Sequence, residues 1–109
     1  MSKSFAEMQD MYRNVVRRFQ EIEGKPWQAQ GAMIELTKQT GELAKQVMLK
    51  ENYYAWAGEE MEVNQRLGNE MADVIAQVMR LADYYQIDLE QAFIEAREDE
   101  DKYLSSRGV

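Results

Sequence analysis

The sequence predicts an all-α protein, a four-helix antiparallel bundle formed by one domain that spans residues 1–109. Apolar residues recur at helical spacing along nearly the whole chain. The strict alternation of apolar and polar residues that marks a strand is almost absent. One proline and six glycines leave few interruptions, and short connections favour antiparallel neighbours.

The first two helices are separated by a clear stop signal. Within the N-terminal segment 1–24, a helix is expected over residues 4–23, because Gly24 is a helix stop. Pro26 then suits the first turn of the next helix. The second helix is expected over residues 26–51. Gly41 lies inside it at a cost of about 1 kcal/mol relative to alanine, which predicts close approach of another backbone or a ligand. The expected inner side of this helix comprises Met33, Leu36, Leu43, Ala44 and Val47.

The second half of the chain predicts a loop and two more helices. Residues 52–62 form the loop, whose aromatic residues Tyr53, Tyr54 and Trp56 suit a subunit interface better than base recognition. The third helix covers about 62–85. The fourth runs from the N-cap Asp88 to about 103, leaving 105–109 as a flexible tail. The expected inner side of the third helix comprises Leu67, Met71, Val74, Ile75, Val78, Leu81 and Ala82.

Composition excludes several classes of function. The chain has no cysteine and no histidine, so thiolate metal sites and histidine catalysis are absent. A net charge of −7 argues against duplex nucleic acid as a partner. There is neither an apolar run long enough for a membrane span nor the pattern of a secretory signal, so we expect a soluble, cytoplasmic protein without a membrane partner.

Two acidic motifs on separate helices carry the functional prediction. Glu70 and Asp73 are three residues apart and share one helix face, and Glu42 directly precedes an apolar residue of the second helix. If these helices pack together, the carboxylates converge and need a cation. Mg²⁺ is the expected cofactor, with Mn²⁺ as the alternative. Gln39 can contact the same ion, and Glu35 lies one turn further away. The competing interpretation is a solvated acidic face.

The order of three motifs resembles the MazG-like all-α nucleoside triphosphate pyrophosphohydrolases. The motifs are 41–44 (Gly-Glu-Leu-Ala), 70–73 (Glu-Met-Ala-Asp) and 87–90 (Ile-Asp-Leu-Glu), and the resemblance covers roughly 27–96. It implies a homodimer or homotetramer that uses Mg²⁺ to cleave a nucleoside triphosphate into a monophosphate and pyrophosphate. It also implies that Glu42, Glu70 and Asp73 are three of four metal ligands.

The chain departs from the family pattern in the first motif. Lys38 and Gln39 occupy the places of a Glu-Glu pair. Gln39 would therefore be a neutral fourth ligand, which predicts weaker magnesium binding and weakened activity. Lys38 can contact a phosphate as a point charge, and Glu35 is the candidate base that activates water.

The second departure lies in the fourth helix. Ala96 and Glu100 stand where relatives carry a lysine and an asparagine for the nucleotide, with Arg97 as a candidate replacement for the lysine. Trp27 is a candidate for stacking on the base, although capping the core is favoured. Three hypotheses remain: the pyrophosphohydrolase, a catalytically silent relative that binds nucleotide or metal, and a plain helical oligomer.

Overall fold

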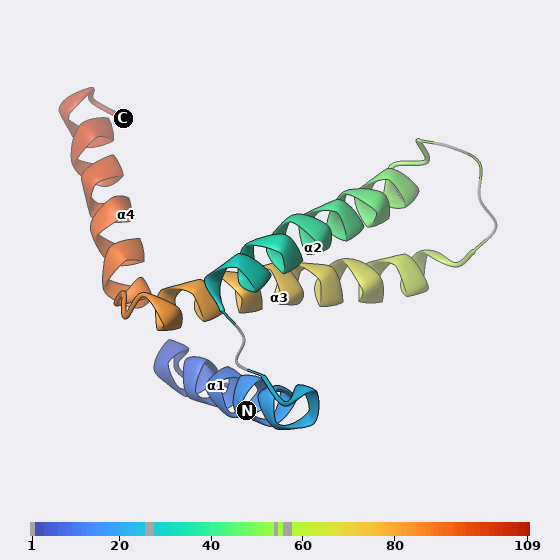
Figure 1. The fold of residues 1–109 in the computed structure, drawn as a ribbon. Helices are drawn as coiled ribbons and strands as arrows, with labels where there is room; N and C mark the ends of the chain where they lie inside the picture. The colour runs from blue at the N-terminus through green and yellow to red at the C-terminus, as the bar shows by residue number, and fades with distance from the viewer. Residues whose placement is uncertain (1, 26–27, 54, 56–57) are drawn as a thin grey trace.

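The computed structural model describes residues 2–25, 28–53, 55 and 58–109. These residues form α1 (Phe5–Glu23), α2 (Ala29–Lys50), α3 (Glu60–Tyr84) and α4 (Leu89–Ser106), shown in Figure 1. No strand occurs within them. The all-α prediction is confirmed, and the predicted helix ends agree to within about three residues. None of the described helices is long and apolar enough to cross a membrane.

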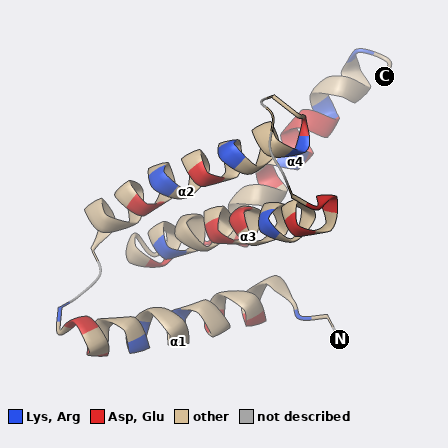
Figure 2. Cartoon of the chain, turned by 90° about the vertical axis from the view of Figure 1, so that its right-hand side faces the viewer, with Lys and Arg blue, Asp and Glu red and all other residues tan. Residues whose placement is uncertain are grey.

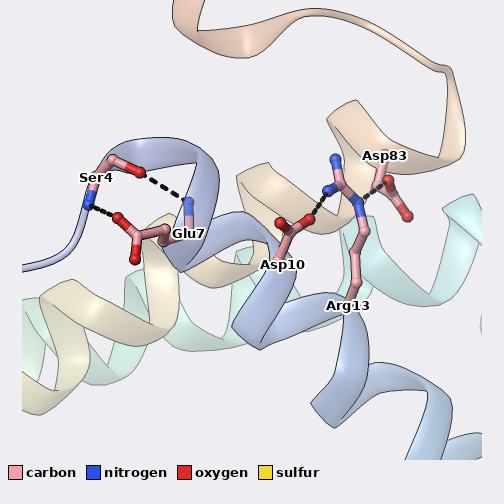
Figure 3. A network of polar contacts seen from close by, with 5 residues as sticks. All are labelled: Ser4, Glu7, Asp10, Arg13 and Asp83. Atoms are coloured by element: carbon pink, nitrogen blue, oxygen red, sulfur yellow. Dashed lines mark hydrogen bonds and ion pairs between the residues drawn. The ribbon is translucent and has the colours of Figure 1, made fainter.

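Local capping explains where α1 and α4 begin. The Ser4 hydroxyl accepts a hydrogen bond from the Glu7 amide at 3.1 Å, and the Glu7 carboxylate accepts from the Ser4 amide at 3.0 Å (Figure 3). Gly24 ends α1 in the left-handed conformation, with φ of 68°. At the start of α4, the Asp88 carboxylate accepts a hydrogen bond from the backbone amide of Gln91 at 3.0 Å, which confirms Asp88 as the N-cap.

The centre of the fold is an antiparallel hairpin of α2 and α3. At the end where the connection joins the two helices, the Lys50 ammonium lies 2.5 Å from the Glu60 carboxylate. At the other end, a Cβ added to Gly31 would lie 3.1 Å from the Arg80 guanidinium, so glycine permits this approach. Small side chains hold the helices close together. The buried apolar residues are Ala29, Ala32, Leu49, Val63, Met79 and Ala82.

α1 lies along α3, and α4 projects away from the other helices (Figure 1). The Arg13 guanidinium donates to Asp83 on α3 at 2.5 Å and to Asp10 on its own helix at 2.6 Å (Figure 3). Arg13 and Asp83 are about half exposed and Asp10 is 74% exposed, so the Arg13–Asp83 ion pair orients α1 and adds only about 0–1 kcal/mol of stability. The four helices therefore do not enclose one common core within a single chain.

The predicted inner faces are wrong at several positions. On α2, Met33 is 49% exposed and Val47 is 44% exposed, and Ala44 is also exposed. On α3, Met71 and Ile75 are 50% and 51% exposed. The apolar stripe of each helix is wider than its contact with one neighbour, and the buried residues of α2 are Ala29, Ala32, Gln46 and Leu49. Apolar surface is consequently left outside.

Candidate metal and nucleotide site

The register of the hairpin brings the acidic motifs to one level. The Lys50–Glu60 and Gly31–Arg80 contacts show that residues of α2 and α3 lie side by side when their numbers add to about 110. Glu70 therefore lies between the levels of Gln39 and Glu42. This register supports the expectation that these positions are neighbours across the two helices.

Glu70 occupies the seam between α2 and α3 rather than its solvated edge. Its side chain is half-buried, as are those of Glu35 and Gln39 on the facing helix. One Glu70 carboxylate oxygen, Oε2, is buried and has no hydrogen-bond partner in the described part of the chain. A buried acceptor left in this state costs about 1–3 kcal/mol, and more when it is charged. A cation would offset this cost.

The other two expected ligands lie at the edge of the seam. Glu42 and Asp73 are exposed. As the side chains stand, no group of three or more acidic residues in the described structure is close enough to hold a metal ion. A donor set of carboxylate and amide oxygens nevertheless fits Mg²⁺ or Mn²⁺, and the exposed carboxylates of Glu42 and Asp73 are free of packing that would fix their rotamers.

The two residues expected to act on water and phosphate pair with each other. The Lys38 ammonium lies 3.8 Å from the Glu35 carboxylate, one turn apart on α2, and the two side chains are 62% and 41% exposed. The pair is largely solvated and can separate when another anion binds the lysine.

A chain of buried polar groups links α1 to α3 near this seam. The amide of Gln77 donates to the Tyr12 hydroxyl at 3.1 Å, and the guanidinium of Arg80 donates to Gln77 at 3.0 Å. Burial raises the pKa of Tyr12, and nearby Asp73 and Glu35 raise it further, against lowering by the Arg80 charge and the Gln77 hydrogen bond. Both carboxylates therefore lie near the same hydroxyl.

An open groove of about 660 Å³ adjoins Glu35, a volume in the range of small-molecule sites. Its charged lining consists of two cationic side chains, Lys25 and Arg80, and two carboxylates, Glu23 and Glu35. Arg80 is only 8% exposed, which places its charge in poorly solvated surroundings. Such a charge suits an anionic ligand.

The sequence prediction missed Tyr12, Gln77 and Arg80, because polar residues within an apolar stripe give no recognisable motif.

Arg97, a predicted substrate residue, is not brought to this site. Arg97 forms an ion pair with Glu100 and lies over the Phe93 ring, 4.9 Å from its centre. All three residues belong to α4, which projects from the hairpin (Figure 1). Trp27 lies outside the described residues.

No protein-family model matches this chain, and no curated protein is similar enough to it to count as a match. The described fold is all-α with four helices, and the family expected from the three motifs remains a hypothesis.

Proposed function

We propose that this chain is a magnesium-dependent nucleotide pyrophosphohydrolase of the MazG-like type, which cleaves a nucleoside triphosphate to a monophosphate and pyrophosphate. The carrying observation is the buried, unpartnered oxygen of Glu70, level with Gln39 and Glu42 across the hairpin. Burial of a carboxylate oxygen without a donor is destabilising unless a ligand is bound there. The same resemblance implies a homodimer or homotetramer.

Each residue has a defined task in this proposal. Gln39, Glu42, Glu70 and Asp73 would hold the ion, which when bound supplies charge neutralisation at the phosphates and orients water. Lys25 and Arg80 attract the polyphosphate into the groove. Glu35, which also lines the groove, accepts a proton from water once Lys38 turns toward a phosphate.

The activity is tested by measuring pyrophosphate release from canonical and modified nucleoside triphosphates with Mg²⁺ or Mn²⁺. Glu70→Ala should lower the rate by at least about 100-fold, as expected for loss of a metal ligand. Glu98→Ala, in the exposed acidic run of α4, should leave it unchanged. Equal rates for the native chain and Glu70→Ala with every nucleotide would remove the proposal.

A catalytically silent nucleotide- or metal-binding protein is the second candidate. The Lys38–Glu35 ion pair favours it, since this pair engages Glu35, the candidate base. Calorimetric titration separates the two functions. Binding of a nucleoside triphosphate with Mg²⁺, without release of pyrophosphate, identifies the silent protein. The plain helical oligomer predicts neither binding nor a magnesium-dependent rise in melting temperature.

A further inference from the structure

A nearly apolar groove lies in the elbow between α3 and α4. Its volume is about 520 Å³, and the start of α1 closes one side. Seven apolar side chains line it: Phe5, Val74, Ile75, Val78, Leu89, Phe93 and Ile94. Phe93 is 59% exposed and Ile75 is 51% exposed, although both are large hydrophobic residues. An open apolar surface of this kind marks an interaction site.

The chain cannot cover this groove with its own last helix. A hydrogen-bonded turn joins α3 to α4, in which the Ile87 amide donates to the Ala82 carbonyl at 2.8 Å. Gln86 adopts a left-handed conformation with φ of 56°, and Asp88 caps α4 immediately afterwards. The short turn fixes the direction of α4 away from the hairpin (Figure 1).

The accessible surface of the chain exceeds that of a compact monomer by about as much as one partner buries in a permanent dimer. The accessible surface of the chain is 8460 Å², against about 6,300 Å² for a compact monomer of 12.8 kDa. The excess of about 2,200 Å² matches what one partner buries in an obligate homodimer, about 1,000–2,500 Å². A second copy of the chain is always available to cover an area of this size.

Charge also favours a second copy at the elbow. Two chains of net charge −7 repel each other, so they must meet where charge is absent. Glu90 is the single charged residue in the lining of this groove. The acidic run 98–101 lies further along α4, as Figure 2 shows by its red segments. A crossing near Phe93 keeps the two acidic runs apart.

We propose that two copies of this chain associate through the α3–α4 elbow, with α4 of each copy packed across the groove of the other. The interface is isologous, so each copy supplies the same residues around a two-fold axis. This inference names the surface used by the homodimer and does not depend on the hydrolytic activity proposed above.

The mass in solution tests the interface. By light scattering after gel filtration, the native chain should show at least twice 12.8 kDa. Phe93→Asp should reduce the mass to that of one chain, because it buries a charge in the interface. Ile22→Asp is the matched control, since Ile22 is 82% exposed on α1 outside the groove, and its mass should equal the native one. A native chain of 12.8 kDa at all concentrations, or a Phe93→Asp mass equal to the native mass, overturns the proposal.

Cross-linking provides a second measurement that does not need a disruptive change. The chain has no cysteine, so one introduced cysteine can only be linked to another molecule. Ile94→Cys should give a covalent dimer with a short bis-maleimide, and Ile22→Cys should not. Linking of Ile22→Cys but not Ile94→Cys places the contact elsewhere and overturns the proposal. Pyrophosphate release is assayed separately, so loss of association and loss of activity are distinguished.

Discussion

At the scale of single residues, Glu70 is the position where folding and function compete. A carboxylate oxygen buried in the α2–α3 seam without a hydrogen-bond partner weakens the fold. Natural chains retain such a group when it binds something, because functional sites commonly sacrifice stability. Removal of the charge at this position and addition of magnesium should therefore each stabilise the fold, the second only while the carboxylate is present.

Glu70→Met is expected to raise the free energy of unfolding by about 1 kcal/mol without metal, since an unsatisfied buried acceptor is replaced by an apolar group. It should also abolish stabilisation by Mg²⁺. Urea unfolding at one protein concentration, with and without Mg²⁺, measures both effects. The control Glu98→Met lies on exposed α4 and should change stability by less than about 0.5 kcal/mol. A less stable Glu70→Met chain in metal-free buffer contradicts this account.

Tyr12 should make the fold sensitive to alkaline pH. Its pKa is raised above the usual 10.0, first by burial, so the folded state holds the proton more tightly than the unfolded state. The resulting stabilisation is complete below pH 10.0 and is lost as the pH rises through the folded pKa.

Tyr12→Phe isolates this contribution from the titration of other groups. The variant should be about 1 kcal/mol less stable at neutral pH, because the buried Gln77 amide loses its acceptor. The difference in unfolding free energy between the native chain and Tyr12→Phe should become smaller above pH 10.0. Urea unfolding of both chains across this range is the measurement, with Tyr103→Phe on exposed α4 as the control. A deficit that is constant with pH would show that Tyr12 ionises equally in both states.

Residue identity predicted candidate ligands but not their convergence. Helical spacing puts Gln39 and Glu42 on one side of α2, and the hairpin register puts Glu70 between their levels. No three acidic side chains of the described residues lie close enough together to hold a metal ion. Burial of Glu70 within the seam could not be predicted, because it depends on the rotation of α3 against α2. The Tyr12–Gln77 hydrogen bond joins residues 65 positions apart, and no local pattern reports it.

At the scale of elements, start and stop signals were sufficient to locate the helices. Ser4, Gly24 and Asp88 act through contacts with residues three or four positions away, so a sequence window contains the whole interaction. The faces of the helices were harder to predict. Met33 and Met71 belong to apolar stripes but are about half exposed. An apolar stripe predicts that a helix has a buried face, but it does not predict which residues of that face contact which neighbouring helix.

Gly41 shows the same limit. Its place inside α2 predicts a close approach, but a Cβ added there would meet no heavy atom within 4 Å. Within the described chain no other backbone approaches Gly41, so that half of the prediction is wrong, and the approach of a ligand stays a prediction. Glycine in the middle of a helix is consequently a weak guide to contacts inside a single chain.

At the scale of the whole molecule, four helices produce an open structure. The radius of gyration is 17.4 Å, against about 13 Å for a compact domain of this length. The number of helices does not predict this larger radius of gyration, because the radius depends on the direction that the short α3–α4 turn gives to α4. Since much of the apolar surface is outside, stability should belong to the assembly rather than to the single chain.

The melting temperature should therefore depend on protein concentration. When unfolding separates two chains, each ten-fold dilution removes about 1.4 kcal/mol per dimer and lowers the melting temperature by about 3 °C. Scanning calorimetry or circular dichroism over a hundred-fold range of concentration measures this slope. Ile22→Asp should keep the native slope. Phe93→Asp should melt lower and with no slope, because its unfolding involves one chain. A native melting temperature that is constant on dilution would mean that α1, α2 and α3 hold together without a partner, and that the α3–α4 elbow stays open in solution.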